Sequence, residues 1–169
     1  MLPLNAVRCG RTDDPPAFLQ LRAGPLEMIF DPETAFLRKL RVGESEVLRA
    51  IYVALRDRDW NTILAKISDL RLEQAERAFE IQFDVECRAR EIAFSWHGLI
   101  RGEPNGTVSY SMDGEALSTF LRSRIGFCVL HPIRECAGRP CTIRKIDGSK
   151  EEGVFPDEAT SKRQEIASG

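Results

Sequence analysis

Apolar and polar residues alternate through the middle of the chain. In the clearest case, from Phe79 to Val85, every second residue is apolar and the residues between are Glu, Gln and Asp. The alternation returns over 91–99 and 108–112, and the turn sequence Pro-Asn-Gly lies between these two segments. A period of two is the pattern of a strand with one face buried and the other in water. Residues 91–112 are therefore predicted to form a hairpin.

Shorter apolar runs, most of them bounded by turn residues, predict further strands over 18–22, 26–30, 36–42, 47–55, 125–130 and 141–146. The run 125–130 is nearly continuous, which predicts a central strand covered on both faces. Asp113-Gly114 predicts a second turn. Helix-like spacing is weak and is confined to 68–80 and 113–124. Many short strands joined by tight turns predict an all-β antiparallel sandwich with little helix.

Length and composition are those of one globular domain. The chain has 169 residues, of which 43% are hydrophobic and 30% charged, enough for a substantial core. We expect a loose leader over 1–16, a single β-sandwich domain over 17–155, and a polar, frayed tail over 156–169.

Charge and cysteine usage narrow the class of protein. The formal net charge is −2 and the pI is about 5.8, which argues against a nucleic-acid or anionic-membrane partner. Apolar runs are far shorter than the ~20 residues that span a bilayer, and the N-terminus lacks the pattern of a signal peptide. Five cysteines without regular spacing are typical of reduced thiols, so a cytoplasmic protein is expected.

The first candidate site is the end of the strand in "IYVALRDRDWNTI" (51–63). If the strand continues through residue 60, counting by two places Tyr52, Arg56, Arg58 and Trp60 on one face. An indole beside two guanidiniums suits a polyhydroxylated or carboxylated ligand, because the ring stacks on C–H faces and arginine forks onto oxygen atoms. The alternative, which the pattern alone favours, is that the arginines pair with neighbouring acids and Trp60 covers the core.

The second candidate site surrounds the 125–130 run. Arg122 and Arg124 precede this run, and His131 follows it. His131 is one of only two histidines and is a candidate general acid or base, or a group that polarises a ligand carbonyl. A nucleophile set of His131, Glu135 and Cys136 is a further hypothesis. The alternative is that His131 is a structural residue.

No motif indicates a metal or a cofactor. Cys136 and Cys141 are close in sequence, but a zinc site needs two more ligands at similar spacing, and none follows. Gly-rich phosphate loops, nucleophile elbows and His-Glu-x-x-His motifs are absent from the sequence. His97 lies on the polar side of its predicted strand, where it either meets a ligand or is half exposed.

Two blocks of sequence resemble the N-terminal region of bacterial D-apionate lactonases. They are "GESEVLRAIYVALRDRDWNTI" (43–63) and "STFLRSRIGFCVLHPIRECAGRPCTIRKIDGSKEEGVFP" (118–156), within a resemblance that runs in order over most of 25–156. Members of this family open the lactone of a branched sugar acid. The resemblance implies a sandwich of the galactose-mutarotase-like, supersandwich type, in agreement with the strand pattern. It also implies a sugar or sugar-acid lactone as ligand and the further domains of a longer enzyme as partners.

Four hypotheses for the function follow. The first is the N-terminal domain of a sugar-acid lactone hydrolase, which supports substrate binding or packing between domains, with or without activity of its own. The second is a carbohydrate-binding module in which Trp60 stacks on a sugar. The third is a mutarotase-like isomerase that uses His131 or His97 with an acidic partner. The fourth is a purely structural packing domain. The residues expected to bind ligand are Arg56, Arg58, Trp60, Arg122 and Arg124, and the catalytic candidate is His131.

Overall fold

A computed structural model of the chain describes residues 18–157. Contacts along the backbone divide the chain into two compact units, residues 1–130 and 131–169. The expected leader lies outside the described residues, as does all but the start of the expected tail. The assignment of 17–155 to one domain stays a prediction, and the two units are described separately.

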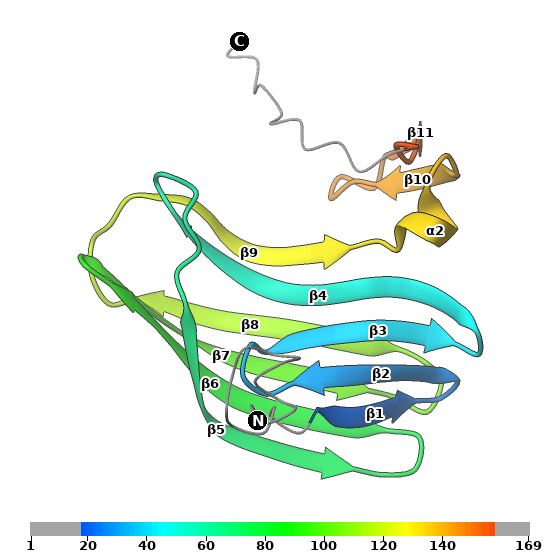
Figure 1. The fold of residues 1–169 in the computed structure, drawn as a ribbon, viewed down its shortest axis with the longest axis horizontal. Coiled ribbons are helices and arrows are strands. Elements are labelled where there is room, and N and C mark those ends of the chain that lie inside the picture. The colour runs from blue at the N-terminus through cyan, green and yellow to red at the C-terminus, as the bar shows by residue number, and fades with distance from the viewer. Residues whose placement is uncertain (1–17, 158–169) are drawn as a thin grey trace, which may run out of the picture. The chain divides into compact units, whose positions relative to one another are not determined.

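The first unit consists of two antiparallel sheets, which Figure 1 shows as two layers. The five-stranded sheet has the order β1 (Leu19–Ala23), β2 (Leu26–Asp31), β3 (Phe36–Val42), β4 (Ser45–Asp57) and β9 (Arg122–Leu130). The four-stranded sheet has the order β5 (Ala65–Gln74), β6 (Phe79–Ala89), β7 (Ile92–Gly102) and β8 (Val108–Ala116). The expected all-β antiparallel sandwich is thereby confirmed.

The core of the first unit lies between the two sheets. Fully buried side chains come from both layers, including Met28, Phe30 and Leu37 from one and Ile81, Phe83 and Ile100 from the other. The rings of Phe30 and Phe83 meet across the interface, with centroids 5.5 Å apart. Burial of these apolar side chains is the main force that holds the layers together.

Gly98 lets β7 pass close to an aromatic ring of the core. A Cβ atom at this position would lie 2.4 Å from the Phe83 ring, which is closer than real atoms approach. Phe83 is fully buried and lies directly opposite Gly98 on the neighbouring strand β6. The glycine therefore has a packing reason inside a strand, where it otherwise weakens the structure.

Three expectations about the elements are wrong. Strand β9, which contains the 125–130 run, lies at an edge of its sheet and pairs with β4, with Val129 and Leu130 on the surface. Residues 113–114 continue β8 instead of forming a turn, because Gly114 lies over the Phe94 ring, where a Cβ would be 2.6 Å from Cζ.

Helix-like spacing was also misleading. Residues 68–74 belong to β5 and residues 113–116 to β8. The pairing register of β5 shifts between Ser68 and Arg71, and Asp69 has a φ of 52°. Such an irregularity interrupts the alternation of inward and outward side chains, which made this strand resemble a helix in the sequence.

The second unit contains a short helix and a hairpin. Helix α2 (Ile133–Cys136) precedes β10 (Pro140–Arg144) and β11 (Lys150–Val154), which pair antiparallel. The hairpin turn is closed by the Lys145 and Ser149 backbones, and Asp147 accepts hydrogen bonds from Ser149. Among residues 18–157, no helix is long and apolar enough to cross a membrane.

Candidate functional site

The pairing of β4 with β9 gathers polar side chains on one face of the five-stranded sheet. Tyr52 lies opposite Cys128, and Arg56 lies opposite Arg124. Residues directly opposite one another in an antiparallel pair point to the same face. The intervening residue Leu55 belongs to the core. Tyr52, Arg56, Cys128 and Arg124 therefore lie on the outer face of the sheet.

Seven residues on this face line a cavity of about 290 Å³: Tyr52, Arg56, Trp60, Arg124, Cys128, Val129 and Leu130. We call this cavity the β4–β9 pocket. It combines an indole, a phenol and two guanidiniums with the apolar side chains of β9. Of the five residues that the sequence predicts to bind ligand, the structure brings together Arg56, Trp60 and Arg124.

An aromatic row leads from the pocket across the outer face. The Tyr52 ring stacks on that of Phe36, with centroids 4.1 Å apart and planes 13° apart. The guanidinium carbon of Arg38 lies 4.3 Å from the Phe36 centroid, and Arg38 also pairs with Asp31 at 3.3 Å. The Tyr52 ring is thus stacked on a neighbour that is itself held by a cation–π contact.

Trp60 lies at the pocket because the chain makes a tight turn after β4 and does not continue as a strand. The strand ends at Asp57, whose backbone C=O accepts a hydrogen bond from Trp60 N–H at 3.1 Å. Trp60 has a φ of 66°, a left-handed conformation that is uncommon for a large residue. Its side chain is 59% exposed. The expectation that the strand extends through residue 60 is therefore wrong, although Trp60 does line the same pocket as Arg56.

The carboxylate of Asp57 shapes this turn. Oδ1 accepts hydrogen bonds from the backbone N–H groups of Asp59 and Asn61, and Oδ2 accepts one from the Asn61 side chain. The Asn61 side-chain hydrogen bond, followed by the backbone ones, lowers the pKa of Asp57 below its ordinary value. The turn therefore depends on the ionised form of this residue.

Arg58 and Arg122 lie apart from the β4–β9 pocket. Arg58 pairs with Asp59 at 3.5 Å and lines a different cavity of about 250 Å³ with Arg90, Glu91 and others. Arg122 lies opposite Asp57 at the start of β9 and lines neither cavity. The strand-like count that joined Arg58 to Arg56 failed because the chain turns after Asp57.

The pocket residues that sequence reasoning did not select are Tyr52, Cys128, Val129 and Leu130. Tyr52 was on the correct face in the count by two, but Cys128 could be found only from the pairing of β4 with β9. Burial, with a hydrogen bond to Cys128 as the next cause, raises the pKa of Tyr52, and nearby Arg56 opposes the shift. The phenol is thus protonated at neutral pH and can donate a hydrogen bond to a ligand.

His131, the predicted catalytic residue, lies in the second unit. Its ring is exposed and lies 4.9 Å from that of Phe155, in a tilted contact. Glu135 and Cys136 are in the adjacent helix α2. Within residues 131–157, no hydrogen bond or ion pair joins His131 to either of them, so the hypothetical nucleophile set is not assembled in this structure.

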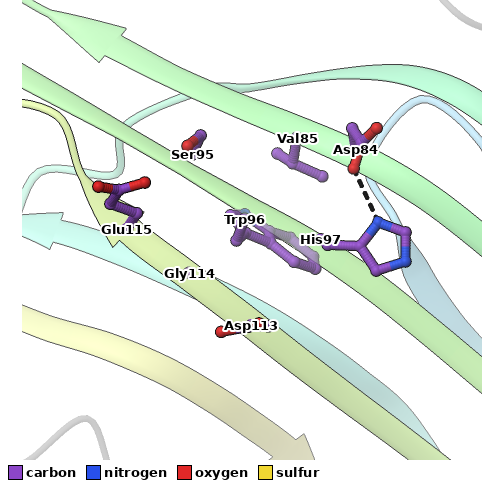
Figure 2. Close-up of a pocket in the computed structure, with 8 residues that line it drawn as sticks. All are labelled: Asp84, Val85, Ser95, Trp96, His97, Asp113, Gly114 and Glu115. Carbon is purple, nitrogen blue, oxygen red and sulfur yellow. Dashed lines mark hydrogen bonds and ion pairs between the residues drawn. The ribbon is translucent and has the colours of Figure 1, made fainter.

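A third polar surface lies on the outer face of the four-stranded sheet. Figure 2 shows the His97 ring turned toward Asp84, and Nδ1 lies 2.8 Å from Asp84 Oδ1. Asp113 and Glu115 on β8 complete an open depression of about 410 Å³. Both partners of the ion pair are about half exposed, at 49% and 54%. In the described part of the chain, no group of three or more His, Cys, Asp or Glu side chains is arranged to hold a metal ion.

Comparison with known proteins places the chain in a family. Residues 6–165 match the family model described as D-apionate lactonase, N-terminal domain. A D-apionate lactonase of Brucella anthropi is 31% identical over 137 residues, which are 80% of this chain and 22% of that relative. The matched region thus spans about a fifth of the length of the relative. No solved structure gives a significant match. The family model covers nearly the whole chain, which therefore belongs to the D-apionate lactonase N-terminal domain family.

Proposed function

We propose that this chain is the substrate-binding N-terminal domain of a sugar-acid lactone hydrolase, with the β4–β9 pocket as its binding site. One observation carries the proposal: Tyr52 and Arg56 on β4, Trp60 in the turn after it, and Arg124 on β9 line one cavity. Family membership supplies the class of ligand, because the relative is named a D-apionate lactonase.

Each of these side chains has a role that suits a small oxygen-rich ring. The exposed indole of Trp60 stacks on the C–H face of the sugar. Arg56 and Arg124 donate hydrogen bonds to hydroxyl or carbonyl oxygen atoms. Tyr52 donates from its protonated phenol. Val129 and Leu130, which are 48% and 43% exposed, provide the apolar edge against which the carbon skeleton lies.

The pocket is better equipped to bind a lactone than to open it. Lactone hydrolysis needs a base that activates water and donors that stabilise the tetrahedral oxyanion. Arg56, Arg124 and Tyr52 supply donors, but among the described residues that line the pocket there is no carboxylate or imidazole. We therefore propose that turnover depends on groups outside the pocket. His131 stays the candidate within this chain for the proton transfer.

Packing between domains is the second candidate role. Trp60, Val129 and Leu130 together expose apolar surface around the pocket, and exposed apolar patches commonly mark interfaces. The matched relative is several times longer than this chain, so further domains of such an enzyme are available as partners. Under this hypothesis the pocket residues contact protein instead of sugar.

Proton NMR of the 169-residue chain with D-apionolactone and other aldonolactones tests the proposal. We expect shifts of the Trp60 indole and of β9 amides on addition of lactone. Trp60→Ala should weaken binding roughly fivefold, because an aromatic contact is worth about 1 kcal/mol, and should leave the fold intact. Phe18→Ala, which removes another exposed aromatic side chain, should have no effect. Absence of any shift at millimolar lactone would overturn the binding role and favour the packing role.

The same spectra, followed over time, report on chemistry. If lactone opens faster than in buffer and the rate follows protein concentration, the domain is catalytic by itself. His131→Ala is then expected to abolish turnover while binding survives. If the rate equals that in buffer, this domain only binds, and the chemistry requires the remainder of a longer enzyme.

A further inference from the structure

Two positive charges lie directly opposite one another in the β4–β9 pocket. Arg56 on β4 and Arg124 on β9 are partners in the antiparallel register. Most other directly opposed charges in the first unit are complementary, and where Glu73 lies opposite Glu80, the Glu80 carboxylate has a cationic partner. Glu80 and Arg101 are opposite one another and form an ion pair at 2.6 Å. Like charges directly opposite on a sheet are destabilising, so the arginine pair calls for a compensating anion.

Within residues 18–157, no carboxylate neutralises these two guanidiniums. Arg56 donates from Nη1 to the backbone C=O of Trp60 at 3.4 Å and to the Thr62 hydroxyl. Arg124 donates from Nη2 to the backbone C=O of Phe127 at 3.2 Å. These acceptors are all neutral.

The guanidiniums also keep hydrogen-bonding capacity for a ligand. Each has five N–H donors in a planar fork, and these contacts engage one nitrogen of each side chain. The phenol of Tyr52, held protonated by its surroundings, adds no negative charge. The pocket therefore combines two uncompensated cations with free donors and with aromatic surface.

We infer that Arg56 and Arg124 together bind the carboxylate of a sugar acid, so that the pocket holds the open-chain acid more tightly than the uncharged lactone. This inference rests on the proposed function, since it assigns a charge to the ligand of the same pocket. A carboxylate accepts two parallel hydrogen bonds from each guanidinium fork, and the carbon chain attached to it lies along Trp60 and the apolar side chains of β9.

The aromatic lining distinguishes a sugar acid from a simple anion. Inorganic phosphate would be attracted by the two charges, but it has no carbon skeleton to place against Trp60, Val129 and Leu130. A neutral sugar makes the stacking contact but leaves the arginine repulsion in place. A carboxylated sugar both neutralises the two arginines and stacks on the aromatic and apolar side chains. Its affinity should fall as salt is added, because salt screens the charges.

The experiment is a calorimetric or NMR titration of the 169-residue chain with four probes: D-apionate, D-apionolactone, a neutral sugar of similar size, and inorganic phosphate. We expect D-apionate to bind at least tenfold more tightly than each of the others at low salt. Arg124→Gln should remove most of this preference, because it should weaken binding of D-apionate far more than binding of the lactone. Arg71→Gln, which removes an exposed arginine of the other sheet, serves as the matched control and should change neither affinity.

Reversing the charge of Arg124 tests the inference through the Tm of the free domain, without any ligand. Arg124→Glu places a carboxylate opposite Arg56, so it should raise the Tm of the free domain at low salt and abolish binding of the acid. Arg71→Glu should not raise the Tm. If Arg124 were only a structural residue, the same Arg124→Glu change would lower the Tm.

The two proposals fail in different ways. If lactone and acid bind equally and both are weakened by Trp60→Ala, the carboxylate inference is overturned while the binding function stands. If phosphate binds as tightly as the acid, the pocket is a general anion site and the inference is again overturned. If no probe binds, the proposed function itself is wrong.

Discussion

Asp57 holds Asn61 by two hydrogen bonds, one from the backbone N–H at 2.8 Å and one from side-chain Nδ2 at 3.0 Å. The Asn61 C=O in turn accepts the Asp57 N–H at 3.1 Å. These contacts close a turn whose apex includes Trp60 in a left-handed conformation. A strained residue of this size persists only where its surroundings determine it. Asp57 is thus the residue that keeps the indole at the pocket.

Removal of the Asp57 carboxylate should release Trp60 from this position. In Asp57→Ala the turn loses three hydrogen bonds, so the order parameter of the Trp60 amide should fall from about 0.85 toward 0.6. Asp59→Ala is the matched control, because Asp59 makes only an exposed contact with Arg58 through its side chain. Nitrogen-15 relaxation measures the order parameter of the Trp60 amide in both variants. An unchanged order parameter in Asp57→Ala would show that packing of the indole, not the carboxylate, orders the turn.

The same turn should loosen in acid. Asn61 and the neighbouring backbone N–H groups lower the pKa of Asp57 below its ordinary value of 3.8. A depressed pKa means that the contribution of Asp57 to the turn is fully present above pH 3.8 and is lost as the pH falls through the folded-state value. In an NMR titration, the Asn61 side-chain amide should therefore move with a midpoint below 3.8. Asp57→Asn should remove this transition, and a midpoint above 3.8 would contradict the assigned hydrogen bonds.

Tyr110 joins the two sheets through one hydrogen bond. Its hydroxyl donates to the backbone C=O of Ala35 at 2.9 Å, and burial raises the pKa of Tyr110. Tyr110→Phe leaves the Ala35 carbonyl without this donor, so we expect a loss of about 1 kcal/mol in the free energy of unfolding. Urea denaturation measures the change. Ser109→Ala, at an exposed position on the same strand, should stay within about 0.5 kcal/mol of the parent.

Strong alternation made much of the sandwich predictable from the sequence. The pattern from Phe79 to Val85 corresponds to β6, and the segments on either side of Pro104 correspond to β7 and β8. Prediction failed where local geometry departs from a regular strand, as at Asp69 in β5 and Gly114 in β8. A bulge hides the period of two, and a glycine that makes room for a ring resembles a turn.

The candidate pocket was only half predictable for a different reason. Arg56 and Trp60 are neighbours in sequence, and their association could be inferred, although from a wrong conformation. The pairing of Arg56 with Arg124 depends on the register of two strands that are far apart in the chain, and no local spacing encodes that register. Arg58 was included because strand counting cannot show where a strand ends, and Arg122 because it precedes the 125–130 run together with Arg124.

Tyr52→Phe tests the hydrogen bond of the Tyr52 phenol separately from the stacking of its ring. The phenylalanine ring can keep the stacking on Phe36, while the hydrogen-bond donor that faces Cys128 and Arg56 is removed. We expect lactone affinity to fall about threefold to tenfold, which is the loss of one hydrogen bond of about 1 kcal/mol.

Each of the two tyrosine variants should change one property only: Tyr52→Phe the lactone affinity, and Tyr110→Phe the stability. Tyr52→Phe should weaken lactone binding and leave the urea midpoint nearly unchanged, because Tyr52 lies at the surface pocket. Tyr110→Phe should lower the urea midpoint and leave lactone affinity unchanged, because Tyr110 lines no part of the pocket. Equal lactone affinity in Tyr52→Phe and the parent would mean that the phenol does not contact the ligand, and the binding site would then have to be sought on another face of the domain.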